Sequence, residues 1–227
     1  MTQSVKKPRR YDSSLRQEQA SATRRAVLTA AHDLFVEHGY PATTMAAIAA
    51  RAGVSVETIY SSFASKPNLL RRVWDVTVGG DDTDVAYRDR PVILALRREP
   101  DLARRLALMA HNMRLLAERT LPFLRMLAGA AHAEPAAAEM LAEVDAQRLA
   151  GMTLMAREAG KTGQLAVSEA ECRDVLWTVS RGELWQLLVV QRGWRPQRYE
   201  RWLADVLVQA LVDPGITSPV HGASDGP

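Results

Sequence analysis

Apolar residues recur every three or four positions in the first third of the chain, which predicts a series of short helices. One helix is expected over about 20–38, a second over about 45–52 and a third over about 55–63. Gly53 separates the second from the third, so the chain turns sharply between them. A fourth helix is expected to begin near residue 66.

Residues 79–91 break this pattern with two glycines, four aspartates and a closing proline, so we expect a junction near them. Helical periodicity returns afterwards, and the expected spans are 92–98, 101–119, 122–132, 135–160, 168–192 and 196–212. Prolines stand near three of these starts, where a missing N–H costs little. No alternating strand pattern occurs. The sequence therefore predicts an all-α fold.

The expected organisation is an amino-terminal three-helix domain joined to a larger helical body. We divide the chain into a disordered basic tail (1–19), a helix-turn-helix domain (20–66), a larger helical domain (67–213) and a disordered tail (214–227). The last segment is rich in Gly, Pro and Ser.

Charge changes this picture because it is unevenly distributed. The net charge is only +3, yet residues 1–72 contain 11 Lys and Arg against 5 Asp and Glu. The rest of the chain contains 18 Lys and Arg against 21 Asp and Glu. A nucleic-acid-binding head would show this balance, but so would a solvated basic tail, since Lys6, Lys7, Arg9 and Arg10 supply much of the excess.

Several classes of protein find no support in the sequence. No apolar run has the length of a membrane span, and the amino terminus does not resemble a secretory signal. The single Cys172 has no partner for a disulfide or a zinc site. Neither a nucleophile elbow, a phosphate loop nor a zinc-protease motif occurs. We expect a cytoplasmic protein that is not an enzyme and uses no metal or cofactor.

The stretch "AGVSVETIYSSFASK", residues 52–66, has the composition of a helix-turn-helix. Its second helix would hold Ile59 inward and present polar residues outward. Thr58, Ser61 and Ser62 could hydrogen-bond phosphates or base edges, and Tyr60 could reach a phosphate with its hydroxyl. Alternatively, Tyr60 merely packs and Thr58 merely caps.

The run "RRAVLTAAHDLFVEHGYPATTMAAIAARAGVSVETIYSSFASKPNLL", residues 24–70, closely resembles the tetracycline-repressor (TetR) family of transcriptional regulators. It shares the family's Phe-x-x-x-Gly-Tyr, Thr-Thr, Ile-Ala-x-x-Ala-Gly-Val-Ser, Thr-Ile-Tyr and Phe-x-x-Lys elements. The resemblance implies DNA contacts at Thr44, Ser55, Val56, Glu57, Thr58, Tyr60, Ser61 and Lys66. Glu57 and Ser62 depart from the residues common in the family. The acidic Glu57 would be repelled by phosphate unless it accepts a hydrogen bond from a cytosine amino group.

The resemblance also implies a small-molecule effector pocket in the helical body. Methionine adapts to varied ligands, and six of the eight lie within 101–160. The candidate lining residues are Met109, Asn112, Met113, Phe123, Met126, Met152, Met155 and Trp177. Ordinary core packing is the alternative for each methionine.

The last predicted helix carries a long apolar stripe, which serves either the core of one chain or the seam of a dimer. The family pairs its last two helices into a four-helix bundle, and the resemblance therefore implies a homodimer. The candidate interface residues are Trp185, Trp202, Val206, Leu207 and Leu211.

The function expected from these features is regulation of transcription by a homodimer. It would repress by binding a palindromic double-stranded DNA operator, and a small-molecule effector would release it. A transcriptional activator of the same fold and a helical adaptor that binds protein stay as alternatives.

Overall fold

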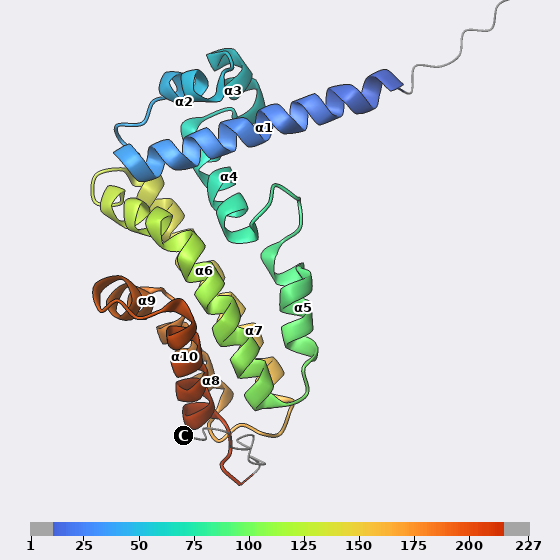
Figure 1. Ribbon diagram of the computed structural model, residues 1–227, viewed down its shortest axis with the longest axis vertical. Helices are drawn as coiled ribbons and strands as arrows, with labels where there is room; N and C mark the ends of the chain where they lie inside the picture. The colour runs from blue at the N-terminus through green and yellow to red at the C-terminus, as the bar shows by residue number, and fades with distance from the viewer. Residues whose placement is uncertain (1–10, 216–227) are drawn as a thin grey trace, which may run out of the picture. The chain divides into compact units, whose positions relative to one another are not determined.

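The structure is a computed structural model that describes residues 11–215 (Figure 1). Within this range the chain is helical apart from turns, loops and an isolated antiparallel bridge between Leu165 and Val212. This confirms the all-α expectation. The described chain forms two compact units, one of residues 11–82 with 126–138 and the other of residues 83–125 with 139–215.

The first unit contains four consecutive helices at its amino-terminal end. They are α1 (Tyr11–His38), α2 (Met45–Ala52), α3 (Val56–Phe63) and α4 (Lys66–Gly79). Helix α1 packs against both α2 and α4. Their inward apolar side chains are almost fully buried: Val27, Leu34, Phe35, Met45, Ile48, Ile59, Phe63, Leu69, Leu70 and Val73. The short helices α2 and α3 are therefore held by one core rather than by their own length.

The second unit is built from the helices that follow. They are the 3₁₀ turn η1 (Tyr87–Asp89), α5 (Pro91–Arg98), α6 (Leu102–Ala130), α7 (Pro135–Gly160), α8 (Glu169–Val179), α9 (Glu183–Trp185), the π-helix η2 (Gln186–Gln191) and α10 (Pro196–Leu211). The end of α6 and the beginning of α7 belong to the first unit. A single hydrophobic cluster joins side chains from α5 to α10.

Helix α1 begins earlier than the sequence pattern predicts. It starts at Tyr11, so residues 11–19 are helical rather than part of a disordered tail. This segment contains good helix formers but no apolar stripe, so amphipathic periodicity does not mark it as a helix. Residues 1–10 and 216–227 lie outside the described range, as do the expectations made for them.

The boundary between the units also differs from the expected one at residue 66. Helix α4 belongs to the first unit, which extends along the chain to Asp82. The reason is packing, since Leu69 and Leu70 of α4 are fully buried in a core shared with α1. The glycine- and aspartate-rich break at 79–91 is the better marker of the junction.

Pro122 does not begin a new helix, as the sequence suggested; α6 runs through it without interruption. A proline inside a helix removes one hydrogen bond, here the bond to the carbonyl of Glu118. Both Pro122 and Glu118 are exposed, so water can satisfy this carbonyl. Ala117 and Phe123 are buried on either side of the proline and favour a continuous helix.

The single helix expected over 168–192 is broken in the structure. Helix α8 ends at Val179, and Gly182 follows with a positive φ of 96°. This conformation costs glycine little, whereas other residues rarely adopt it. The chain then resumes as α9 and η2 before α10. The apolar pattern is helical on both sides of Gly182 and therefore conceals the turn.

Candidate DNA-binding site

The turn between α2 and α3 has the geometry that its sequence predicts. Gly53 adopts the left-handed conformation, with φ 68° and ψ 33°, and its N–H donates to the end of α2. Ser55 then caps α3, because its hydroxyl accepts the N–H of Thr58 at 3.2 Å. A left-handed glycine followed two residues later by a cap lets two short helices meet at a steep angle, as in a helix-turn-helix.

Helix α3 has one buried face and one exposed face. Ile59 and Phe63 are 0% and 4% exposed, whereas the adjacent Tyr60 is 49% exposed. Glu57 and Ser61 are exposed with Tyr60, and Val56 and Thr58 are half-buried beside them. The six α3 residues expected to contact DNA, Ser55 included as the cap, therefore lie at least partly open to solvent.

The hydroxyl groups of α3 are already oriented by the helix itself. Ser61 and Ser62 each donate to the carbonyl oxygen of Thr58 at 2.9 Å. The hydroxyls of Ser55 and Thr58 lie 3.1 Å apart. In this arrangement Ser61 and Ser62 keep their oxygen lone pairs as acceptors toward the exterior, suited to the amino groups of cytosine or adenine.

Glu57 is an exposed carboxylate in the first turn of α3. Hydrogen bonds from its own backbone N–H and from the Ser55 hydroxyl lower its pKa, so it stays ionised at neutral pH. Its charge stabilises the amino-terminal end of the helix dipole. The same charge repels phosphate, and its possible partners on DNA are amino groups.

The two threonines before α2 have different roles. Thr44 is exposed and caps α2, accepting the N–H of Ala47 at 3.1 Å. Thr43 is 1% exposed, and its hydroxyl lies 2.8 Å from the carbonyl oxygen of Gly39 and 3.0 Å from that of Leu34. Thr43 thus fastens the turn to the end of α1. The resemblance pointed to Thr44 as the exposed residue of the pair, but the sequence contains no signal for the buried role of Thr43.

Lys66 occupies a different environment from the one expected of a phosphate contact. Its ammonium donates to the carbonyl oxygen of Tyr40 at 2.6 Å and lies 4.2 Å from the centroid of the Tyr40 ring. Burial lowers its pKa. The side chain therefore ties the start of α4 to the turn before α2. Lys66 is only partly buried, and the expectation that it contacts a phosphate stays a prediction.

The chain leaves α3 through a strained residue. Ala64 has a φ of 61° and a ψ of −39°, and it is the one described non-glycine residue with a positive φ. The N–H of Ser65 donates to the carbonyl oxygen of Phe63 at 2.7 Å, which makes a γ-turn centred on Ala64. This turn sets the direction in which α4 departs from α3.

The expected effector residues lie in several environments within the body helices. Four of the methionines, Met109, Met113, Met152 and Met155, join the hydrophobic cluster of the second unit. Asn112 is buried and accepts a hydrogen bond from the hydroxyl of Tyr87 at 2.9 Å. The remaining three, Phe123, Met126 and Trp177, are outside that cluster. The structure thus gathers half of the eight residues.

Trp177 is engaged with α7 rather than with the methionines. The guanidinium of Arg148 lies 4.5 Å from the centroid of its ring and donates to its carbonyl oxygen at 2.5 Å. The indole Nε1 is buried and has no hydrogen-bond partner.

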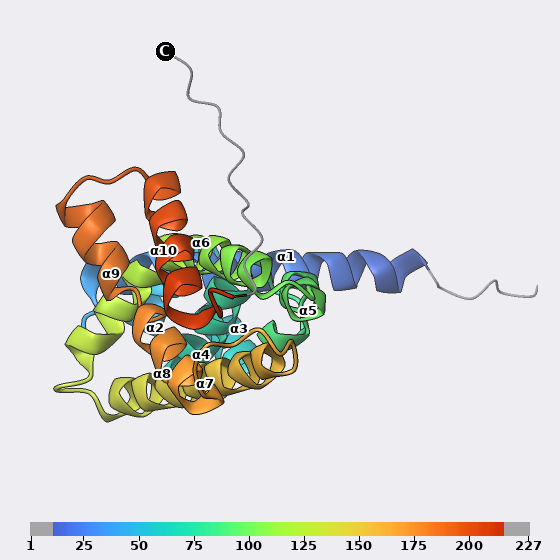
Figure 2. The same ribbon diagram turned by 90° about the horizontal axis from the view of Figure 1, so that it is seen from below.

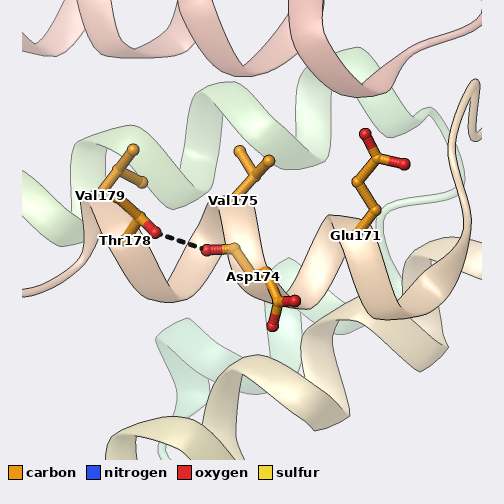
Figure 3. Close-up of a pocket in the computed structure, with 5 residues that line it drawn as sticks. All are labelled: Glu171, Asp174, Val175, Thr178 and Val179. Carbon is orange, nitrogen blue, oxygen red and sulfur yellow. Dashed lines mark hydrogen bonds between the residues drawn. The ribbon is translucent and has the colours of Figure 1, made fainter.

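A hollow of the second unit runs along the surface of α8 (Figure 3). It is lined by Glu171, Asp174, Val175, Thr178 and Val179, none of which was expected at the effector site. The Thr178 hydroxyl donates to the carbonyl oxygen of Asp174 at 2.8 Å, as Figure 3 shows. Because one helix supplies every lining residue, this hollow is an open groove.

Three of the five expected dimer residues serve the core of their own chain. Trp185, Leu207 and Leu211 are 6%, 0% and 0% exposed, which corrects their assignment to an interface. Trp202 and Val206 are half-buried and keep some surface free. The centre of the apolar stripe of α10, with Leu207 and Leu211, therefore faces the core, while its edge, with Trp202 and Val206, keeps some accessible surface.

Other chemistry finds little support in the described part of the chain. No group of three or more His, Cys, Asp or Glu side chains that could hold a metal ion occurs there. No described helix is long and apolar enough to cross a membrane. Cys172 is fully buried, and burial raises the pKa of its thiol to about 11, so it is not a ready nucleophile.

The left-handed turn, the capped helix α3 and its exposed outer face define a helix-turn-helix domain carried on a helical body. Residues 27–73 match the model of the family described as bacterial regulatory proteins, tetR family. This segment, which contains α2 and α3, is therefore similar to the proteins of that family. A comparison with curated protein sequences gave no match.

Solved structures share the fold along most of the chain. SmeT, the repressor of the Stenotrophomonas maltophilia multidrug efflux pump SmeDEF, is 23% identical, with 92% of this chain and 99% of SmeT covered and a TM-score of 0.62. The SmeT–triclosan complex is likewise 23% identical, with 91% of this chain and 99% of that chain covered and a TM-score of 0.63. NalD, the secondary repressor of the MexAB-OprM multidrug efflux pump in Pseudomonas aeruginosa, is 18% identical. The match covers 86% of this chain and 98% of NalD, with a TM-score of 0.62.

Proposed function

We propose that this protein represses transcription by binding an operator with the exposed face of α3. The observation that supports this most strongly is the contrast along α3: Ile59 is fully buried while Tyr60, next to it, is 49% exposed. An outer face of hydroxyl groups and one tyrosine suits base edges and phosphates. The capped turn before α3 gives the helix a defined angle for entering a major groove.

The operator should be a palindrome read by a homodimer. One recognition helix reads few base pairs, so two helices related by a dimer axis would supply the specificity. Selection from a random duplex library with the full-length protein tests this. The expected product has two inverted half-sites whose centres lie about one helical turn or slightly more apart. Recovery of no enriched sequence would contradict the proposal.

The second unit is proposed to bind a small organic effector that weakens operator binding. Support comes from the methionines gathered in its core, which adapt to varied ligands, and from SmeT, whose structure with triclosan has this fold. The hydrogen-bonded pair of Tyr87 and Asn112 could supply polar contacts there. An effector that binds the released form about 100-fold better contributes ~2.7 kcal/mol of coupling.

A ligand screen by thermal unfolding, followed by operator titration, tests the effector. A true effector raises the unfolding temperature and weakens operator affinity. Because linkage is reciprocal, the operator should weaken effector affinity by the same factor. Ligands that stabilise the protein without changing operator affinity would contradict this part of the proposal.

Repression is favoured over activation because SmeT and NalD are both described as repressors. A reporter gene placed behind the selected operator separates the two. Deletion of the protein should raise expression from a repressed promoter and lower it from an activated one. A helical adaptor would bind no specific duplex and leave the reporter unchanged.

A further inference from the structure

The outer face of α3 lacks the side chains that most often read guanine or adenine. The helix has the sequence VETIYSSF and contains no Lys, Arg, Asn or Gln. Arg51 is the one Lys or Arg between residues 26 and 65, and it donates to the Glu37 carboxylate at 2.9 Å. Arg and Lys make the commonest specific contact to guanine, and Asn and Gln the bidentate contact to adenine. The polar side chains of α3 are instead one carboxylate and several hydroxyls.

The hydroxyl protons at the start of α3 are directed toward Glu57. The hydroxyl of Ser55 donates to the Glu57 carboxylate. Ser55 has a single hydroxyl proton, so Thr58 is the donor in the 3.1 Å contact between the Ser55 and Thr58 oxygens. The Ser55 oxygen also accepts the N–H of Thr58 at 3.2 Å. The hydroxyl protons of Ser55 and Thr58 are therefore both used within the helix.

The two serines at the end of α3 use their protons in the same way. Ser61 and Ser62 each donate to the carbonyl oxygen of Thr58 at 2.9 Å, although both residues are exposed. Their oxygens can then only accept from a partner outside, as can the exposed carboxylate of Glu57. Tyr60, 49% exposed, is left to donate its hydroxyl to a phosphate. Apart from Tyr60, the outer face of α3 presents hydrogen-bond acceptors.

We propose that Glu57 is a specificity-determining residue, whose carboxylate accepts a hydrogen bond from the N4 amino group of one cytosine in each half-site. The inference rests on the proposed function and names the base that α3 selects. In the major groove only the amino groups of cytosine and adenine donate. Adenine places its N7 acceptor beside the amino group, where it would repel a carboxylate. Cytosine presents the donor without an acceptor of its own.

The same carboxylate acts against other sequences. In front of the O4 of thymine or the O6 of guanine, two acceptors face each other without a proton between them. The charge of Glu57 would then lose its water and gain no partner, which disfavours such a site. Replacing Glu57 by a neutral residue should therefore raise affinity for unrelated duplexes and lower the preference for cytosine.

The first experiment compares operator selection by full-length wild type and Glu57→Ala from one random duplex library. The two selected sequences should differ at one position in each half-site, where the wild type requires cytosine and the variant accepts several bases. Replacing this cytosine should weaken wild-type binding by about 5- to 150-fold per half-site. The same replacement should hardly change binding by Glu57→Ala. Equal profiles for the two proteins would overturn the inference.

The second experiment removes only the amino group. In the selected operator, 2-pyrimidinone replaces the cytosine and lacks its 4-amino group. Wild-type affinity should fall, whereas the affinity of Glu57→Ala should stay the same, since the cycle isolates the coupling between carboxylate and amino group. The same replacement outside the half-sites should leave both proteins unaffected. Equal losses in wild type and Glu57→Ala would show that the amino group has another partner.

A conservative variant tests whether Glu57 reads a base or only stabilises the helix. Glu57→Gln keeps the size of the side chain and supplies both a donor and an acceptor, so its preference should move from cytosine toward adenine. A structural role would not change the selected base. Unfolding temperatures of both Glu57 variants should stay close to the wild type. A preference for cytosine that is unchanged in Glu57→Gln and Glu57→Ala would contradict base reading.

The charge-matched control is Glu18→Gln, which removes an exposed carboxylate from the same unit. Glu18 belongs to the amino-terminal turns of α1, which extend beyond α2, α3 and α4 in Figures 1 and 2. This variant should keep the cytosine preference, and an equal loss there would assign the effect to net charge. If the wild type selects an operator that Glu57→Ala also selects, only this inference is wrong. If the wild type selects no operator, the proposed function itself has failed.

Discussion

Neighbouring residues of α3 have opposite surroundings, and this contrast determines what a substitution there does. Ile59 is fully buried and Tyr60 is 49% exposed, although the two residues are adjacent in the chain. A change at Ile59 acts on the core, whereas a change at Tyr60 acts on the exterior. Affinity and stability can therefore be measured separately on a single helix.

Tyr60→Ala should change the unfolding temperature little and weaken operator binding by roughly 2–4 kcal/mol, because each dimer loses two contacts of ~1–2 kcal/mol. Titration on the selected operator measures this. Tyr60→Phe separates the hydroxyl from the ring, and Ile59→Ala is the buried control, expected to cost about 2–4 kcal/mol of stability. Wild-type affinity of Tyr60→Ala would mean that another face of α3 meets DNA.

Ala64→Gly should raise the free energy of unfolding by about 1 kcal/mol, in a range of about 0 to 2.5 kcal/mol. The positive φ of 61° costs a residue with a Cβ about 1–3 kcal/mol, and the extra flexibility of unfolded glycine returns about 0.5–1 kcal/mol of that gain. Ala64→Val should instead destabilise, since a branched side chain tolerates this conformation poorly. Denaturant titration measures both, and a stabilising valine would rule out the strain.

At the scale of elements, one carboxylate joins the first and fourth helices. Asp82, whose side chain is 10% exposed, accepts from Arg24 of α1 and Arg72 of α4. The Arg24 guanidinium also lies 5.8 Å from the centroid of the Phe63 ring at the end of α3. Asp82 is the last residue of this stretch of the first unit, and the chain continues from it into the second. It is therefore a positioning residue for α3, the helix that we propose to read the operator.

Asp82→Asn should lower the stability of the first unit by about 1–2 kcal/mol. The full cost of breaking a buried pair is larger, but both arginines are about a third exposed, so solvent screens the loss. Asp75→Asn is the matched control, because Asp75 also pairs with Arg72 but its side chain is 57% exposed. Hydrogen exchange of α1 and α4 amides measures the effect, and equal protection in both variants would contradict it.

At the scale of the whole molecule, adjacent residues of α10 distinguish core from interface. Leu207 is fully buried in the second unit, whereas Val206 is half-buried. Further apolar side chains are exposed nearby in sequence, with Leu187 at 48% and Val190 at 54%. We propose that the accessible edge of α10, together with the groove on α8, contacts a second copy.

Val206→Glu should give folded monomers, because it places a charge at the proposed seam while sparing the core. Leu207→Glu should instead unfold the second unit, at a cost of more than about 4 kcal/mol for an unpaired buried charge. Light scattering after size exclusion reports the mass, and circular dichroism reports the fold. A wild-type protein that is monomeric at micromolar concentration would refute the seam.

The sequence by itself determined the elements whose chemistry is local. Gly53 and Ser55 predict the turn and the cap because a left-handed backbone and a hydroxyl acceptor are needed at those positions. The helical period likewise predicted which residues of α3 face inward. Residue type and spacing are sufficient for such features, since the interactions span only three or four residues.

Only the tertiary structure decided which residues distant in the sequence contact one another and which of them are buried. It assigned Lys66 to the carbonyl oxygen of Tyr40, 26 residues away in the chain, and buried Leu207 while leaving Val206 accessible. Burial and pairing depend on which elements pack together, and periodicity within one element does not contain that information.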